Sequence, residues 1–248
     1  MLSTPQNSAP DVPLPAEDKA LAAGLAALRQ QIAAAAHAAG RDVSSITLLA
    51  VSKGQPVARL KAALSLGLTQ FGENYLDEAL PKIGALEGTA AEWHFFGHLQ
   101  GNKTRAVAEN FAWVHGIDRL RIAQRLSDQR PHHAPPLNVC VQVNIAGEAT
   151  KSGVAPNAAL PLLREVAKLP RLRLRGLMCM LPFDLPEAGQ HRYFAALRGL
   201  MESANAEGVA SSTLDTLSMG MSGDLAAAVA EGSTLLRIGT ALFGPRPT

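Results

Sequence analysis

The chain has 248 residues, of which 47% are apolar and 4% aromatic, and its formal net charge is +2. This length suits one large α/β barrel or two smaller domains. The small charge argues against a nucleic-acid-binding surface. Cys140 and Cys179 lie in apolar runs without CxxC spacing, so the sequence predicts no disulfide framework and no metal site. No apolar stretch is long enough to cross a bilayer, and we expect a cytoplasmic protein without a membrane partner.

The first segment, residues 1–16, holds Ser, Pro, Gln, Asn and Asp without periodicity. It has neither the basic region nor the apolar core of a signal peptide, so we expect a disordered leader. One domain should follow over residues 17–248. Its first helix, residues 17–39, is predicted from apolar residues at helical spacing and from a closing glycine, namely Leu21, Leu25, Leu28, Ile32 and Gly40.

Eight short apolar runs alternate with helical segments along the rest of the chain. The predicted strands are residues 46–53, 69–74, 92–97, 111–115, 137–144, 172–180, 214–218 and 233–239. The predicted helices are residues 57–66, 75–86, 102–110, 119–130, 157–169, 187–207 and 224–230, and Pro81 predicts a break in the second of these. This order favours a single (β/α)₈ TIM barrel over an open doubly wound sheet. The helix before the first strand could then cover the barrel floor.

The first predicted strand, Ile46-Thr-Leu-Leu-Ala-Val-Ser-Lys53, ends in a lysine before a Gly-Gln-Pro turn. The carboxyl ends of parallel strands are where such folds bind ligands. An amine held there among apolar neighbours is partly desolvated, which favours the neutral nucleophile that Schiff-base chemistry needs. In the alternative, Lys53 ends the strand and points into water.

The loops after the last two strands suit a phosphate group. Ser222 precedes Gly223-Asp224 and an Ala-rich helix, where it fits an N-cap, and Gly239-Thr240 offers a close backbone and a hydroxyl. Barrels often bind phosphate between these two loops. A phosphate site opposite a Schiff-base lysine indicates a phosphorylated aldehyde, either pyridoxal 5′-phosphate (PLP) or a phosphosugar in an aldolase. Arg237 favours PLP, because it could face the ring nitrogen and keep it unprotonated; alternatively, it pairs with a barrel carboxylate.

Several motifs occur in a fixed order over residues 17–246, nearly the whole chain. They are Leu49-Ala-Val-Ser-Lys53, Phe71-Gly-Glu-Asn-Tyr75, Trp93-His-Phe-Phe-Gly-His-Leu-Gln100, Asn102-Lys103, Val143-Asn144, Lys151-Ser-Gly153, Leu217-Ser-Met-Gly-Met-Ser222, Arg237-Ile-Gly-Thr240 and Phe243-Gly244. In this combination the chain resembles the pyridoxal phosphate homeostasis protein family, the YggS-like or PROSC-like proteins.

The resemblance implies a fold-type III barrel like the N-terminal domain of alanine racemase, with PLP held as an internal aldimine on Lys53. It also implies further cofactor-binding residues, with phosphate contacts from Ser222, Gly239 and Thr240 and a pyridine-nitrogen contact from Arg237. Around the cofactor it places Asn74, Met219 beside the ring, and, as weaker candidates, His94 and Asn144. The implied function is intracellular PLP homeostasis, by storage, buffering or delivery of vitamin B6 to apoenzymes in amino-acid metabolism, without robust catalysis and with no catalytic residue.

Two enzymatic alternatives stay open. A PLP-dependent amino-acid racemase needs a base on each face of its substrate. Two-domain racemases of this fold take the opposite base from a second domain, which we do not expect in this chain; Tyr75 or Tyr193 could substitute. The other alternative is a Schiff-base aldolase. We expect a monomer, with a weak dimer as the alternative, and Lys103 and Lys151 could hold a second PLP or another anion.

Overall fold

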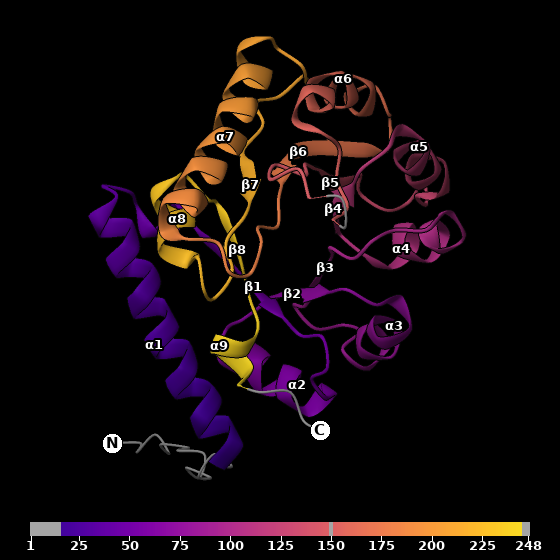
Figure 1. Cartoon of the computed structure of the whole chain (residues 1–248). Coiled ribbons are helices and arrows are strands. Elements are labelled where there is room, and N and C mark those ends of the chain that lie inside the picture. The colour runs from indigo at the N-terminus through magenta and orange to yellow at the C-terminus, as the bar shows by residue number, and fades with distance from the viewer. Residues whose placement is uncertain (1–15, 149–150, 245–248) are drawn as a thin grey trace, which may run out of the picture.

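The computed structural model describes residues 16–148 and 151–244 and shows a closed eight-stranded barrel (Figure 1). All neighbouring strands are parallel and follow the chain order, and β1 closes the barrel against β8. The strands are β1 (Thr47–Val51), β2 (Gln70–Glu73), β3 (Glu92–Phe95), β4 (Trp113–Ile117), β5 (Leu137–Gln142), β6 (Leu172–Met178), β7 (Thr216–Ser218) and β8 (Leu235–Ile238). The predicted (β/α)₈ fold is therefore confirmed, with strands one or two residues shorter at most ends and β4 shifted by two residues toward the C-terminus.

Helices surround the barrel (Figure 1). They are α1 (Ala16–Ala38), α2 (Val57–Ser65), α3 (Leu76–Ala85), α4 (Thr104–Asn110), α5 (Leu120–Gln129), α6 (Pro156–Ala167), α7 (Glu187–Ala206), α8 (Leu225–Ala230) and α9 (Thr240–Phe243), with 3₁₀ turns η1 (Val43–Ser45) and η2 (Gly101–Lys103). Residues 1–15 of the expected leader lie outside the described residues, and Ala16 already belongs to α1. No helix in residues 16–148 and 151–244 is long and apolar enough to cross a membrane.

Side chains alternate between the barrel interior and the helical layer, as the period of two in a strand requires. On β8, Leu236 and Ile238 join the large core beneath the helices. Leu235 instead packs with Leu49 and Val51 in a small separate cluster inside the barrel. Arg237 has the same parity as Leu235, so its guanidinium lies inside the barrel.

Two sequence expectations about helices are wrong. The first helix does not cover the barrel floor. It lies along the outside of the barrel against α2, α8 and α9 (Figure 1). Its single apolar face is buried against these helices. Pro81 does not break α3, which runs through it. A proline costs one hydrogen bond, here to the carbonyl of Asp77 in the first turn, and the buried Lys82 directly after it anchors the helix to the barrel.

Candidate functional site

The carboxyl ends of the strands form the mouth of the barrel, and Lys53 lies there in the turn that follows β1. Gly54 completes this turn with a φ of 73°, a conformation that glycine adopts without strain. Lys53 is half-buried and lines a cavity of about 30 Å³, together with Val51, Gln55, Gly239, Thr240 and Gly244. The structure thus brings the predicted lysine together with Gly239 and Thr240 from the far end of the chain.

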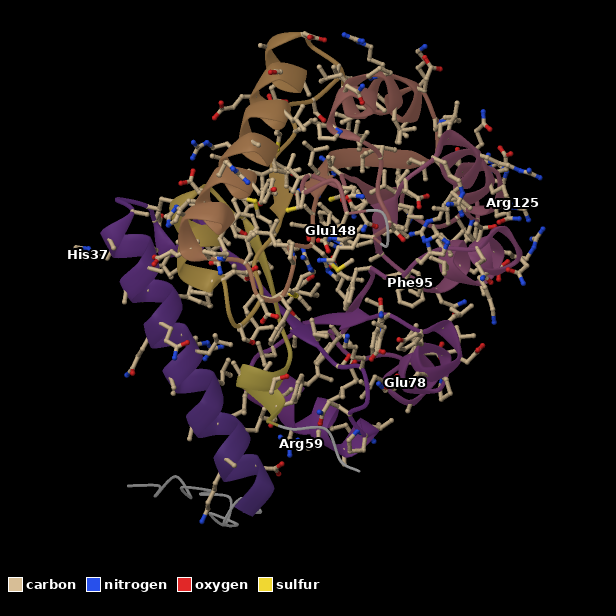
Figure 2. All side chains as sticks on the ribbon, viewed as in Figure 1. His37, Arg59, Glu78, Phe95, Arg125 and Glu148 are labelled. Atoms are coloured by element: carbon tan, nitrogen blue, oxygen red, sulfur yellow. The ribbon has the colours of Figure 1, made fainter. Side chains whose placement is uncertain are left out.

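A buried polar network holds the backbone on both sides of Lys53. Lys82 Nζ donates to the carbonyl oxygen of Ser52 at 2.7 Å, to Glu73 Oε1 at 2.8 Å and to Glu78 Oε1 at 2.5 Å. Ser52 Oγ donates to Glu73 Oε1 at 2.6 Å, and the N–H of Gly54 donates to Glu78, labelled beside α3 in Figure 2. The residues before and after the lysine are therefore both fixed by β2 and α3.

Glu73 and Lys82 form a buried ion pair that the sequence reading did not identify. Glu73 is fully buried and Lys82 is 5% exposed. Burial raises the pKa of Glu73, while the hydrogen bonds from Lys82 and Ser52 act against that rise. Glu73 Oε2 is buried without a hydrogen-bond partner. The signal in the sequence was the spacing of Glu78 and Lys82, one helical turn apart on the buried side of α3.

Arg237 is 3% exposed inside the barrel. Its Nη1 donates to the carbonyl oxygen of Ser218 at 2.6 Å and to Ser218 Oγ at 2.8 Å, and its Nη2 donates to the carbonyl oxygen of Cys179 at 2.7 Å. These bonds use three of the five N–H groups of a guanidinium. Burial lowers its pKa, yet an arginine remains charged. No ion pair among the described residues includes Arg237, so the alternative of a barrel carboxylate partner is not what the structure shows.

The phosphate side of the predicted site lies between β7 and α9. Thr240 is the exposed first residue of α9, and Ser222 is exposed in the turn before α8. Ser222 was expected to be the N-cap of α8, but Asp224 holds that position. The Oδ1 of Asp224 accepts from the N–H of Met221 at 2.5 Å. The helix begins at Leu225, one residue later than expected, because this acceptor closes the preceding turn.

Helix α9 is tied to its neighbour α2. Arg59 Nη2, labelled near α2 in Figure 2, donates to the carbonyl oxygen of Phe243 at 2.6 Å. This bond fixes the segment that carries Thr240 against the helix that follows Lys53.

The two asparagines among the pocket candidates differ in their surroundings. Asn74 follows β2 at the mouth, and an added Cβ on Gly97 would lie 2.1 Å from its carbonyl oxygen, so the loops after β2 and β3 touch there. Asn144 also follows its strand, but its amide organises its own loop: Nδ2 donates to the carbonyl oxygen of Glu148 at 2.7 Å, and Oδ1 accepts from the N–H of Glu148 at 3.1 Å. Asn74 therefore lies where two loops of the mouth meet, whereas the side chain of Asn144 is hydrogen-bonded within its own loop.

Met219 and His94 are not brought to Lys53. Met219 is fully buried in the core beneath the helices, on the outward parity of β7, instead of beside a ring at the mouth. His94 lies inside the barrel but borders a different cavity, at the amino-terminal ends of the strands. His94 was predicted from its residue type and its motif, but its position on β3 places its side chain near the amino-terminal end of the barrel.

Lys103 and Lys151, considered for a second anion, each have a carboxylate partner. Lys103 Nζ lies 3.1 Å from Asp77 Oδ1, and Lys151 Nζ lies 3.1 Å from Glu148 Oε1. They lie in different loops, and neither lines a described cavity.

Cavities larger than the one at Lys53 lie elsewhere in the described part of the chain. A cavity of about 450 Å³, here called the floor cavity, opens at the amino-terminal ends of the strands. It is lined by Ser45, Thr47, Gln70, Glu92, His94, Trp113, Arg175, Asp215, Thr216, Thr234 and Leu235. Another of about 510 Å³ lies between α1 and the start of β1. Lys53 borders neither of these two cavities.

Comparisons with known proteins agree with this geometry. The family model described as the N-terminal domain of alanine racemase matches residues 24–247. A protein of Pseudomonas aeruginosa named pyridoxal phosphate homeostasis protein is 54% identical over 226 residues, which cover 91% of this chain and 96% of that one. The Escherichia coli K12 protein of the same name is 49% identical over 229 residues, 91% of this chain and 97% of its own.

Solved structures show the same barrel. PipY of Synechococcus elongatus, with PLP bound, is 34% identical and superposes with a TM-score of 0.79 over 90% of this chain and all of that chain. Alanine racemase of Corynebacterium glutamicum, 17% identical with a TM-score of 0.70 over 93% of this chain and 62% of that one, shares the fold. The chain therefore belongs to the pyridoxal phosphate homeostasis protein family, whose barrel is that of the N-terminal domain of alanine racemase.

Proposed function

We propose that this protein binds PLP at the mouth of the barrel, covalently through Lys53, and acts in PLP homeostasis by storing, buffering or delivering the cofactor. When bound, PLP supplies an aldehyde carbon, a pyridine ring and a phosphate dianion. The donor set of the mouth fits all three parts. Lys53 offers an amine, Ser222 and Thr240 offer hydroxyls beside the backbone of Gly239, and Arg237 retains N–H groups beyond those bonded to the barrel.

One observation carries this proposal: Lys53 shares a cavity with Gly239 and Thr240, from the two strands that close the barrel. A structural lysine at a strand end needs no such partners. The names of the relatives in Pseudomonas aeruginosa and Escherichia coli, and the PLP bound in PipY, support the same ligand.

We propose a carrier and not an enzyme. A racemase needs a second base facing the substrate from the side opposite the lysine. Of the two tyrosines considered, Tyr75 is 62% exposed, and Tyr193 lies on α7 and packs against the core beneath the helices. The cavity at Lys53 is only about 30 Å³, the space of roughly one water molecule, so the rest of the cofactor would lie toward the open mouth. An open site suits exchange with apoenzymes, which we propose as partners of a monomeric carrier.

The decisive experiment is the visible absorption spectrum of the purified protein with PLP, followed by borohydride reduction and peptide mapping. We expect an absorption band that borohydride bleaches, and the mass of a pyridoxyl group on the Lys53 peptide. Lys53→Ala should lose both, whereas Lys61→Ala, which changes an exposed lysine on α2, should retain both. A reduced adduct that persists in Lys53→Ala would refute the assignment of the anchor.

The phosphate contacts can be tested in the same assay. A hydrogen bond to a charged group contributes about 1.5–3 kcal/mol, so Thr240→Ala and Ser222→Ala should each weaken PLP retention about 10- to 100-fold. A racemase assay across the common amino acids separates carrier from enzyme. Sustained turnover that scales with protein and is lost in Lys53→Ala would overturn the carrier.

A further inference from the structure

A chain of buried side chains connects Arg237 to the floor cavity, across the interior of the barrel. Ser218 Oγ, which accepts from Arg237 Nη1, lies 2.9 Å from His115 Nδ1. His115 Nε2 lies 2.9 Å from His94 Nδ1, and His94 Nε2 lies 2.5 Å from Gln70 Oε1. The five residues belong to β8, β7, β4, β3 and β2; Gln70 is partly exposed, and the other four are buried.

The Gln70 end of this chain sets the direction of the hydrogen bonds between neutral side chains in it. Gln70 Oε1 can only accept, so His94 donates from Nε2–H. A neutral imidazole then accepts at Nδ1, which requires His115 to donate from its own Nε2–H. His115 in turn accepts at Nδ1 from the Ser218 hydroxyl, whose oxygen is left to accept from Arg237. With both histidines neutral, all these bonds are satisfied when each carries its proton on Nε2.

The surroundings favour that neutral state. His94 is 1% exposed and His115 is fully buried, and burial lowers the pKa of His94 to about 3 and that of His115 well below its ordinary value. The charge of Arg237 also opposes protonation of His115. Trp113 stacks on His94 with ring centroids 5.2 Å apart and an interplanar angle of 7°, so the ring of His94 is held in place.

The charged side chains that line the floor cavity have partners outside the hydrogen-bond chain. Glu92 Oε1 accepts from Trp113 Nε1 at 2.7 Å, and lies 3.8 Å from His94 Nε2. Arg175 pairs with Asp215, with Nη2 to Oδ2 at 2.7 Å, and its guanidinium lies 4.7 Å from the Trp113 ring centroid. Neither carboxylate replaces Gln70 as the acceptor that ends the chain.

We propose that Ser218, His115, His94 and Gln70 form a one-directional hydrogen-bond relay that positions Arg237 from the opposite end of the barrel. This inference rests on the proposed function, which assigns Arg237 to the pyridine nitrogen. A guanidinium without a carboxylate partner needs oriented neutral acceptors, and the relay orients the Ser218 hydroxyl so that its oxygen faces Arg237. These four residues are positioning residues, and they connect the PLP site to the floor cavity.

The first test needs no cofactor. Two-bond ¹H–¹⁵N spectra of the seven histidines in the PLP-free protein at neutral pH, with signals assigned from His94→Gln and His115→Gln, report each tautomer. We expect Nε2–H at both buried histidines. We also expect Arg237→Met to shift the signals of His94, whereas Val114→Ala, on the helix-facing side of β4, leaves them in place. An Nδ1–H tautomer at either position, or an unmoved His94 in Arg237→Met, would overturn the relay.

The second test uses the PLP-loaded protein. His115→Phe should weaken PLP retention about 10-fold, the loss expected for one disturbed hydrogen bond to a charged group, and should change the pH dependence of the visible band as the ring nitrogen loses its fixed cation. His115→Gln, which retains an amide donor and acceptor, should recover part of the retention. Val114→Ala should lower thermal stability without changing either PLP retention or the pH dependence of the visible band.

The outcomes separate the two proposals. If His115→Phe changes neither PLP retention nor the pH dependence of the visible band, the four residues do not position Arg237, even if Lys53 holds PLP. If PLP does not attach to Lys53, the proposed function fails, while the tautomers in the PLP-free protein still decide whether the relay exists.

Discussion

Acid should destabilise this protein well above the pH range in which its carboxylates titrate, and His94 allows the size of the effect to be calculated. Its pKa is about 3 in the folded protein and 6.5 when exposed. Because the folded state resists protonation, the unfolded state binds more protons between these two values. The stability that the neutral imidazole provides is complete above pH 6.5 and is lost as the pH falls toward 3.

The linkage relation gives the magnitude. Relative to pH 8, protonation of His94 in the unfolded chain should cost about 1 kcal/mol at pH 5.5 and about 3 kcal/mol at pH 4.5, approaching about 5 kcal/mol below pH 3. His115 acts in the same direction. Since domains are stable by only about 5–15 kcal/mol, this loss should be visible as early unfolding.

Urea unfolding of the PLP-free protein, followed by circular dichroism at pH 8, 5.5 and 4.5 and constant ionic strength, measures this loss. His94→Gln should lose about 3 kcal/mol less than the unmodified protein between pH 8 and 4.5, while His133→Gln, on an exposed loop, should behave like the unmodified protein. Asp215 has a lowered pKa and Glu73 a raised one, and both contributions cancel in the comparison. Equal losses in His94→Gln and the unmodified protein would refute the reasoning.

Three further predictions concern the barrel itself. Lys82→Met leaves the buried Glu73 unpaired and should lower the free energy of unfolding by about 3–5 kcal/mol in urea titrations, with partial recovery when Glu73→Gln is added; a loss below about 1 kcal/mol would contradict the buried pair. Gly176→Ala should reduce stability more than Gly84→Ala, measured as the melting temperature, because the added Cβ would lie 1.9 Å from a backbone oxygen of β7 while Gly84 has open space. Burial raises the pKa of both cysteine thiols to about 12, so a thiol-specific disulfide reagent at pH 8 should label neither until urea unfolds the chain; stoichiometric labelling of the native protein would show that they are accessible.

Much of the barrel could be predicted because its signals are local. Strands buried on both faces appear as short apolar runs between turn residues, and all eight lie where such runs occur. The break at Pro81 was wrongly predicted because a local rule ignores the tertiary contacts of the next residue, Lys82. The cap at Ser222 was wrong because Asp224, two residues on, competes for the same turn.

The site was predictable only where residue type and strand end coincide. Lys53, Gly239 and Thr240 follow strands directly, so topology brings them together. His94 has the residue type of a pocket ligand, but its depth within β3 assigns it to the floor side. Its partner His115 carries no local signal, since the contact depends on the stagger between β3 and β4.

The seam between β1 and β8 has a consequence for when the protein becomes competent to hold a ligand. Leu49 pairs with Arg237 across this seam, and Lys53 meets Thr240 just beyond it, although almost the whole barrel separates them in the chain. During synthesis Lys53 is made well before Gly239 and Thr240, which line the same cavity. In a partly synthesised chain, or in a barrel opened between β1 and β8, Lys53 therefore lacks the neighbours Gly239 and Thr240. Any ligand that spans the seam stabilises ring closure by its own binding free energy, so occupancy reports that the chain has finished folding.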